Sequence, residues 1–215
     1  MTTRILVADD HAIVREGLRR ILAADPTFVV TGEASDANEV MDAVRAGGFE
    51  VLLLDLSMPG RSGIDLVKRV KEEYPELRVL VLSMHAERQY AVRAIRAGAS
   101  GYLTKDTVST QLTAAIRKVA SGGLFITPAV AEALALGLQS ADDKLPHKRL
   151  TDREFEIFLM LANGESVTGI AERLSLSVKT ASTHKTHIVE KMKLNSIAEL
   201  VRYALEHNLL DSRTY

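Results

Sequence analysis

The sequence predicts an α/β domain with a parallel sheet, followed by a smaller domain that is entirely helical. In the first 124 residues, short apolar runs alternate five times with stretches at helical spacing. Such alternation is typical of parallel strands joined by right-handed helical crossovers. The run Val51–Leu54 has four successive apolar residues, as expected of a strand buried on both faces. From about residue 147 onward, only helical patterns recur.

Length and composition limit the classes of protein to consider. The 215 residues are 47% hydrophobic, carry a formal net charge of −1 and include no cysteine. These values suit one or two domains with real cores, and they exclude disulfides and zinc–thiolate sites. No apolar run approaches the roughly 20 residues that cross a bilayer, and the N-terminus lacks a signal-peptide pattern. We therefore expect a soluble cytoplasmic protein with no membrane partner.

The strands of the first domain, residues 1–124, are short apolar runs separated by turn-forming residues. Pro26 follows the first helix, and Met58-Pro59-Gly60 turns the chain after the central strand. The expected strands are 4–8, 28–30, 51–55, 79–82 and 101–104.

The helices after these strands begin and end at recognisable residues. Asp36 and Thr107 are expected N-caps, and glycine pairs follow two of the helices. A further helix, 128–138, precedes the polar stretch Gln139–Pro146, so 125–146 is expected to be a helix and linker. The helices expected in the first domain are 11–24, 36–46, 64–73, 87–97 and 107–121.

The second domain, 147–215, is expected to contain four helices. Thr151 and Glu154 have the spacing of a capping box, and Gly164 follows the helix that they begin. Serines precede the other three helices, at Ser166, Ser177 and Ser196. Residues 144–215 carry a charge of +2, against −3 for the rest, which suggests two units with different partners.

Polar side chains follow four of the five expected strands: Asp9 and Asp10, Asp55, Ser83 and Lys105. The carboxyl ends of parallel strands meet at one edge of the sheet, so these groups are expected to converge. Three carboxylates repel one another unless a cation lies among them, and oxygen ligands suit Mg²⁺. With Lys105 and Ser83 added, the set fits a carboxylate that accepts a phosphoryl group.

Each of these residues also has a plainer interpretation when taken alone. Asp55 could simply end a strand, and Asp9-Asp10 could only cap the following helix. Ser83 could be a strand-end hydroxyl, and Lys105 could be solvated. The order of the whole set along the chain is what favours a functional site.

The motifs VADDH, LLLDLSMPG, VLVLS and GYLTK resemble the receiver domain of bacterial two-component response regulators over all of 1–124. The resemblance implies a flavodoxin-like (βα)5 fold, with Asp55 phosphorylated by a partner histidine kinase. It implies Mg²⁺ held by Asp9, Asp10, Asp55 and the backbone carbonyl of Ser57, with Ser83, Lys105 and Tyr102 contacting the phosphate or relaying its presence. Many receivers have proline after the lysine in a cis peptide bond, whereas Asp106 follows Lys105 here, so that geometry stays open.

The second domain contains the pattern of a helix-turn-helix. Ile170–Leu174 is expected to pack, Ser175–Ser177 to turn, and Val178 to begin a second helix. That helix has lysines and small hydroxyls near its N-terminus, which suit phosphate and base-edge contacts in a major groove. The candidate DNA contacts are Lys179, Thr180, Ser182, Thr183, Lys185, Thr186 and His187, while Ala181, Ile188 and His184 are expected to face the core.

An ordinary helical bundle with a solvated polar face would show some of these features too. The capping box LTDRE and the tract VKTASTHKTHIVEKMKL together resemble the LuxR/NarL-type helix-turn-helix domain. The resemblance implies that 178–192 is the recognition helix and that the helix from about 196 mediates dimerisation on DNA. Its apolar stripe includes Val201 and Leu205, although the stripe could equally face the domain's own core.

Together the two domains indicate a response regulator of the NarL/FixJ type. It would be a phosphorylation-activated transcriptional regulator, with a cognate sensor histidine kinase, promoter DNA and a second copy of itself as partners. The rival interpretations are a regulator that binds DNA without phosphorylation, a small-molecule-sensing LuxR protein, and a phosphohydrolase with Asp55 as nucleophile. Such hydrolases usually have a second Asp where Ser57 stands here. A zinc site at His184 and His187 is a weaker alternative.

Overall fold

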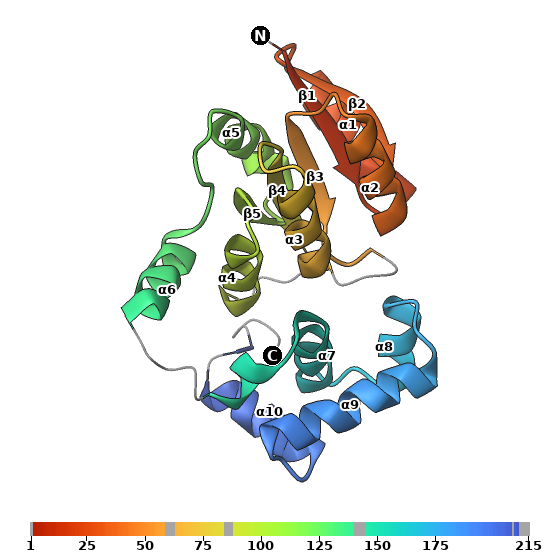
Figure 1. Ribbon diagram of the computed structural model, residues 1–215, viewed down its shortest axis with the longest axis vertical. Helices are drawn as coiled ribbons and strands as arrows, with labels where there is room; N and C mark the ends of the chain where they lie inside the picture. Colours follow the sequence, from red (N-terminus) through yellow and green to blue (C-terminus); the bar gives the residue numbers. More distant parts are fainter. Residues whose placement is uncertain (1, 59–62, 84–87, 140–144, 208, 211–215) are drawn as a thin grey trace. The chain divides into compact units, whose positions relative to one another are not determined.

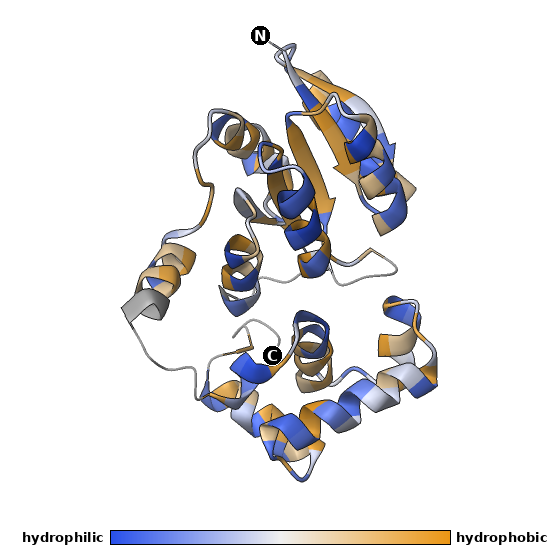
Figure 2. Cartoon of the chain, viewed as in Figure 1, coloured by the Kyte–Doolittle hydropathy of each residue, from blue (hydrophilic) through white to orange (hydrophobic). Residues whose placement is uncertain are grey.

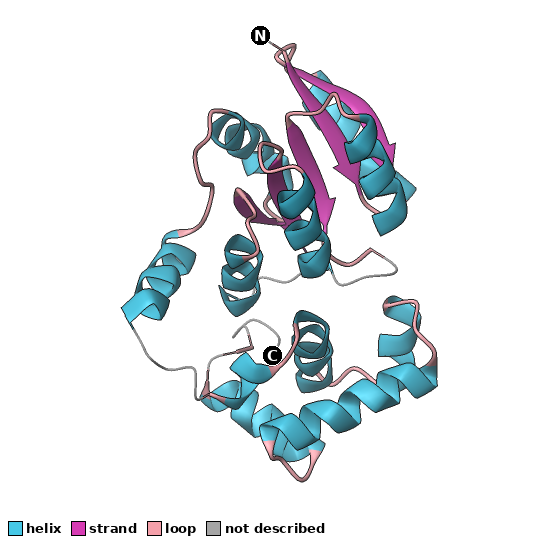
Figure 3. Cartoon of the chain, viewed as in Figure 1, coloured by secondary structure: helices cyan, strands magenta, loops and turns pink. Residues whose placement is uncertain are grey.

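The computed structural model describes residues 2–58, 63–83, 88–139, 145–207 and 209–210 (Figure 1). The chain divides at Pro128–Ala129 into two compact units. The first contains a parallel five-stranded sheet, and the second is helical in its described part (Figure 3). The expected turn at Pro59 and Gly60 and most of the expected linker lie outside the described residues.

The sheet has the strand order β2-β1-β3-β4-β5. This order and the alternation of strands with helices confirm the predicted α/β fold. The strands are β1 (Thr3–Ala8), β2 (Phe28–Ala34), β3 (Val51–Asp55), β4 (Arg78–Ser83) and β5 (Gly101–Thr104). The helices of this unit are α1 (Ala12–Ala23), α2 (Ala37–Ala46), α3 (Gly63–Glu73), α4 (Arg88–Arg96) and α5 (Val108–Ala120).

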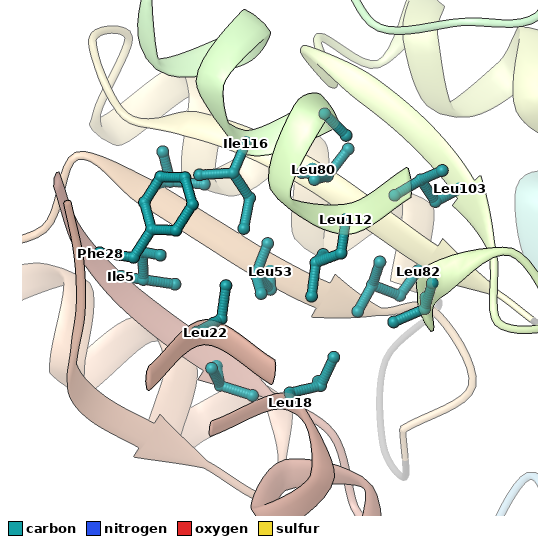
Figure 4. Close-up of a cluster of buried hydrophobic side chains, with 14 of the residues drawn as sticks. Ile5, Leu18, Leu22, Phe28, Leu53, Leu80, Leu82, Leu103, Leu112 and Ile116 are labelled. Atoms are coloured by element: carbon teal, nitrogen blue, oxygen red, sulfur yellow. The ribbon is translucent and has the colours of Figure 1, made fainter. Parts of the chain in front are cut away.

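The central strands of the sheet are buried on both faces because their residues are mostly apolar (Figure 2 shows β3 largely in the hydrophobic colour). One face packs against α1 and α5, where Leu18, Leu22 and Leu112 meet Leu53 (Figure 4). Alternate strand residues, such as Leu52, are equally buried and point to the other face. This two-sided core fixes the strand register, and therefore the level at which each strand ends.

Two local predictions were inaccurate in this unit. The strand expected at 28–30 continues to Ala34, because an edge strand pairs through its backbone while Thr31 and Glu33 stay exposed. Thr107 stands at the start of α5 but makes no capping bond, since its hydroxyl donates to the Thr104 carbonyl instead. Asp36 does cap α2, accepting the N–H groups of Asn38 and Glu39.

The rest of the described chain contains α6 (Pro128–Gln139), a 3₁₀ turn η1 (Pro146–Arg149) that was not expected, and four further α-helices. The predicted capping box is confirmed: the Thr151 hydroxyl accepts the Glu154 N–H and the Glu154 carboxylate accepts the Thr151 N–H. Ser166, Ser177 and Ser196 cap the remaining helices as expected. The four are α7 (Asp152–Ala162), α8 (Val167–Arg173), α9 (Val178–Met192) and α10 (Ile197–Glu206).

Helix α9 packs against both α7 and α8, while α10 packs against α7. Ala181, Ile188 and Met192 form the buried side of α9, and Leu200 and Ala204 form that of α10. None of the described helices is long and apolar enough to span a membrane.

Candidate functional sites

The strand order reverses direction between β1 and β3, and two aspartates stand at this point. Asp9 follows the last residue of β1, and Asp55 is the last residue of β3. Because Ala8 pairs with Leu54, the two aspartates leave the sheet at the same level. Open α/β sheets bind their ligands in the crevice beyond such a pair of strand ends.

Lys105 joins these two carboxylates from the end of β5. Its Nζ donates to Asp9 Oδ2 at 2.6 Å and to Asp55 Oδ2 at 2.8 Å. Both aspartates are almost completely buried, and the Lys105 side chain is only 15% exposed. The interpretation of Lys105 as a solvated lysine is therefore wrong.

Burial and neighbouring charges shift the pKa values of Asp55 and Lys105. Burial raises the pKa of Asp55 above its ordinary value, and the attraction of Lys105 offsets only part of that rise. Burial alone would lower the pKa of Lys105, but Asp55 and Asp9 outweigh it, so the pKa of Lys105 is raised. Lys105 thus stays positively charged at neutral pH and balances one of the carboxylates.

The remaining carboxylate oxygens turn toward the loops after β1 and β3. Asp55 Oδ1 accepts the Ser57 N–H at 3.0 Å, and Asp9 Oδ1 accepts the His11 N–H at 2.9 Å. Asp10 Oδ1 is buried and accepts no hydrogen bond. One ligand atom from each of Asp9, Asp10, His11 and Asp55 lies within 4.8 Å of the others. With a single lysine against three carboxylates, this arrangement suits a divalent cation.

The alternative in which Asp9 and Asp10 only cap the next helix is wrong. The N-cap of α1 is His11, and it makes no side-chain capping bond. Asp9 instead uses its two oxygens on Lys105 and on the His11 N–H.

Ser83 and Tyr102 lie on the neighbouring strands. Ser83 ends β4, is fully buried, and accepts the Lys105 N–H through its backbone carbonyl at 2.8 Å. Tyr102 in β5 is 6% exposed and pairs with Val81. The structure therefore brings Asp9, Asp10, Asp55, Ser83 and Lys105 to one edge of the sheet, as predicted. No cis peptide bond occurs among the described residues, so the bond after Lys105 is trans.

Helices α8 and α9 form the predicted helix-turn-helix. The chain turns at Leu174–Ser177, where Ser175 has a positive φ of 51°. Arg153 of α7 donates to the Leu174 carbonyl at 3.1 Å, which holds the end of α8. Lys191 near the end of α9 donates to both oxygens of Glu154 at 2.7 Å, which holds α9 against α7.

The outer face of α9 is polar and open to solvent. Lys185 is half-buried and the other six candidate contacts are exposed: Lys179, Thr180, Ser182, Thr183, Thr186 and His187. The Thr183 and Thr186 hydroxyls donate to carbonyls one turn earlier, and the Ser177 and Thr180 hydroxyls lie 2.7 Å apart. These bonds fix the side chains close to the helix, leaving the lysines as the long, charged groups of the face.

Two other sequence expectations gain detail from the structure. His184 is half-buried, and burial lowers its pKa, so it lies at the border of the core rather than within it. Among the described residues, the only cluster able to hold a metal is the one at Asp9 and Asp10, so the zinc alternative at His184 and His187 gains no support. On α10, Val201 is half-buried and Leu205 is 52% exposed, so the apolar stripe is only partly used by the core.

Sequence reasoning missed several residues of these sites. His11 is not among the site residues expected from the sequence, yet its Nδ1 lies 2.8 Å from Asp10 Oδ1. A hydrogen bond of 2.8 Å between His147 Nδ1 and the Tyr203 hydroxyl joins η1 to α10, and no sequence pattern predicted it. The run VADDH could have indicated His11, because a residue that directly follows an acid pair lies close to the same site.

An α/β domain with an acidic cluster at the carboxyl edge of its sheet, joined to a helix-turn-helix domain, is the arrangement of a regulator that couples a chemical signal to DNA binding. Residues 5–117 match the family model of the response regulator receiver domain, and residues 148–204 match that of bacterial regulatory proteins of the luxR family. The chain belongs to the response regulators of the NarL/FixJ family. It is a phosphorylation-activated regulator of transcription and not an enzyme, and receiver domains as a family bind Mg²⁺ at an acidic pocket.

Named relatives are similar over nearly the whole chain. The oxygen regulatory protein NreC of Staphylococcus carnosus (strain TM300) is 38% identical over 97% of this chain and 99% of its own. The response regulator UvrY of Escherichia coli (strain K12) is 32% identical over 98% of this chain and 97% of its own. A solved structure of RcsB from Salmonella enterica serovar Typhimurium is also similar, with a TM-score of 0.64 and 28% sequence identity. The match covers 94% of this chain and 98% of the RcsB chain, which is bound to promoter rprA in the presence of phosphomimetic BeF3−.

Proposed function

We propose that Asp55 accepts a phosphoryl group from a cognate sensor histidine kinase. The observation that carries the proposal is the buried arrangement of Asp55, Asp9 and Lys105 at the meeting point of β1 and β3. A carboxylate there is held by two donors, Lys105 and the Ser57 N–H, so it can present an oxygen in a fixed direction. Fixed geometry of this kind lowers the barrier to an in-line displacement.

The transfer is a direct exchange of one bond to phosphorus for another. An Asp55 oxygen forms the new P–O bond while the P–N bond to the kinase histidine breaks, and the imidazole keeps the electron pair and takes a proton from solvent. Lys105 moves from the carboxylates to a phosphoryl oxygen, where its charge stabilises the transition state. The Ser83 hydroxyl and the buried Tyr102 then sense the product phosphate.

We assign a magnesium ion to the oxygens on the loop side of this site. Asp9, Asp10, Asp55 and the backbone carbonyl of Ser57 would hold it. The spacing of the cluster supports this assignment, because ligand atoms of Asp9, Asp10 and Asp55 lie within 4.8 Å of one another and the buried Asp10 Oδ1 accepts no hydrogen bond. When bound, Mg²⁺ withdraws charge from the phosphoryl oxygens.

The output is binding of α9 to promoter DNA by a dimer of this chain in the cytoplasm. The exposed lysines and hydroxyls of α9 support a helix that enters the major groove. Val201 and Leu205 on α10 would form the dimer contact, since Leu205 is a large hydrophobic residue of that helix that is exposed. The domain limits in this proposal are 1–124 for the receiver, 125–146 for the helix and linker, and 147–215 for the DNA-binding domain.

Phosphorylation with a small donor tests the proposal. Incubation with acetyl phosphate and Mg²⁺ should add one phosphoryl group to the wild-type chain, detected by intact mass, and none to Asp55→Asn. EDTA should prevent the gain because the clustered carboxylates then repel the donor. Asp65→Asn, an exposed aspartate on α3, is the matched control and should be modified normally. Labelling of Asp55→Asn at the wild-type level would refute Asp55 as the acceptor.

A further inference from the structure

Arg15 on α1 binds the loop between β1 and α1, which carries two of the proposed cation ligands. Its Nη1 donates to the backbone carbonyl of Asp9 at 2.7 Å, and its Nε donates to Glu33 Oε2 of β2 at 3.0 Å. The Arg15 side chain is only 18% exposed, so water has little access to these bonds. A guanidinium presents its donors in a rigid fork, which can join two separate acceptors in a fixed geometry. Arg15 thereby ties the loop to the neighbouring strand β2.

With this bond, every polar group of Asp9 has a partner. Its N–H donates to the Ala34 carbonyl at 3.1 Å. Its two carboxylate oxygens accept the Lys105 ammonium and the His11 N–H. Arg15 donates to the remaining group, the backbone carbonyl. Asp9 is therefore fixed in both position and direction.

The same bonds determine the backbone on both sides of Asp10. The Asp9 carbonyl belongs to the planar peptide unit that leads into Asp10, so a bond to its oxygen fixes the orientation of that plane. The His11 N–H belongs to the next peptide unit, and it is fixed on Asp9 Oδ1 at 2.9 Å. Because both planes are held, the direction of the Asp10 side chain is set, and its carboxylate lies in the cluster with those of Asp9 and Asp55.

We propose that Arg15 is a positioning residue for the cation at this site and, through the cation, for phosphorylation of Asp55. The inference rests on the proposed function and adds a residue that acts through the backbone of Asp9. The charge and the geometry of Arg15 have opposite effects. A positive charge near a divalent cation repels it, so removal of the charge alone would tighten Mg²⁺ binding. Loss of the bond to the Asp9 carbonyl would weaken Mg²⁺ binding, because the ligand Asp10 is then less well oriented.

Arg19 provides a matched control one turn further along α1. It lies on the same face of the helix as Arg15 and donates to the other oxygen of Glu33 at 3.1 Å. Its second acidic neighbour is Glu16, at 4.0 Å. Arg19→Gln therefore removes an equal charge that shares the same acidic partner, while the bond from Arg15 to the Asp9 carbonyl stays in place.

Calorimetric titration of the full-length chain with Mg²⁺ tests the proposal. Arg15→Gln should weaken Mg²⁺ binding by about tenfold, as is typical when a group that orients a metal ligand is lost. Arg19→Gln should bind Mg²⁺ at least as tightly as the wild type. Arg15→Lys should also bind Mg²⁺ more weakly than the wild type, because one ammonium cannot occupy both donor positions of the guanidinium fork. Thermal unfolding followed by circular dichroism shows whether each variant is folded, and Arg15→Lys serves as the test if Arg15→Gln does not fold.

Labelling by acetyl phosphate gives a second readout. Arg15→Gln should need about tenfold more Mg²⁺ than the wild type for half-maximal labelling. Its rate at saturating Mg²⁺ should stay close to that of the wild type, because Asp55 and Lys105 are unchanged. A general loss of structure would instead lower the rate at every Mg²⁺ concentration.

Asp10→Asn separates failure of the Arg15 role from failure of the cation site. If Asp10→Asn binds Mg²⁺ weakly but folded Arg15→Gln or Arg15→Lys binds it as tightly as the wild type, the positioning role is overturned and the proposed Mg²⁺ site stands. Equal weakening in Arg15→Gln and Arg19→Gln would also overturn it, because the bond to the Asp9 carbonyl would then not be the cause. If Asp10→Asn binds Mg²⁺ like the wild type, the cation does not lie at this cluster and both proposals fail.

Discussion

At the scale of single residues, buried carboxylates are stable only where named partners hold them. Asp9 and Asp55 share Lys105, and Glu154 in the helical unit is bound by Lys191. Leaving such a carboxylate without its partner costs more than the pair itself contributes, because the charge stays buried. The same rule makes Asp10, with its buried oxygen lacking a hydrogen bond, the residue that most needs a cation.

Glu154 gives a prediction about pH at this scale. Burial tends to raise its pKa, but hydrogen bonds from Lys191 and Thr151 outweigh burial and hold the pKa below the ordinary 4.5. A carboxyl with a lowered folded pKa contributes stability above its unfolded pKa and loses it as pH falls through the folded pKa. The fragment 147–215 should therefore lose stability on acidification below about pH 4.5.

Replacing Glu154 with Gln should lower the free energy of unfolding at pH 7 by about 1 kcal/mol, a modest value because Lys191 is 40% exposed. Urea unfolding followed by circular dichroism between pH 3 and 7 measures both effects, with the exposed Glu190→Gln as control. An acid dependence that is as steep in Glu154→Gln as in the wild type would show that another group carries it.

At this scale the sequence was informative where a residue's role follows from its place at a strand end. Asp9, Asp55 and Lys105 were predictable because each directly follows or ends an apolar strand, and the carboxyl ends of parallel strands meet at one edge of the sheet. His147 and Glu156 were not, because both are polar residues that became buried through tertiary contacts. Nothing local in the sequence distinguishes them from exposed residues of the same type.

At the scale of elements, the limits of the helices were predicted better than those of the edge strand β2 and of the connecting segments. The capping box of α7 and the serine caps act within four residues, so the sequence shows them directly. The end of β2 and the turn η1 depend on pairing and packing with distant segments, which explains why the expected limits differed.

Helix α9 gives a prediction about DNA affinity. Lys185 stands in the middle of its polar face, so Lys185→Ala should weaken binding. If the lysine contacts a base edge, the loss should be about 1–3 kcal/mol and depend on sequence. If it contacts phosphate, the loss should be equal on all sequences, and the salt dependence should fall by about one unit of log–log slope.

Fluorescence anisotropy at several salt concentrations distinguishes the two contacts. Lys193→Asn is the matched control, because Lys193 has a left-handed backbone that asparagine tolerates and lies beyond the end of α9. Wild-type affinity in Lys185→Ala on every DNA tested would remove Lys185 from the interface.

At the scale of the whole molecule, the proposed phosphorylation of the first unit can regulate DNA binding only if it changes the behaviour of the second unit. Dimerisation provides one route, since two linked DNA-binding units gain effective concentration on a site with two half-sites. The exposed Leu205 on α10 is the feature that supports this route, while Leu200 and Ala204 already serve the core.

Leu205→Glu should leave the chain folded, because the side chain is 52% exposed, and should reduce binding to DNA with two half-sites far more than to one half-site. The stronger loss follows because a charge in the contact prevents the second copy from assisting the first. Gel-shift titration on both DNAs measures it, with the exposed Ala198→Glu as control. Unchanged cooperativity in folded Leu205→Glu would exclude this residue from the dimer contact.

The central claim is that phosphorylation of Asp55 switches on DNA binding, and one titration tests it most directly. Full-length wild type and Asp55→Asn are titrated onto promoter DNA with and without acetyl phosphate and Mg²⁺. The affinity of the wild type should rise when the donor is present, and that of Asp55→Asn should stay at the unphosphorylated level. Equal affinity of the wild type with and without the donor, while mass analysis shows full phosphorylation, would contradict the claim.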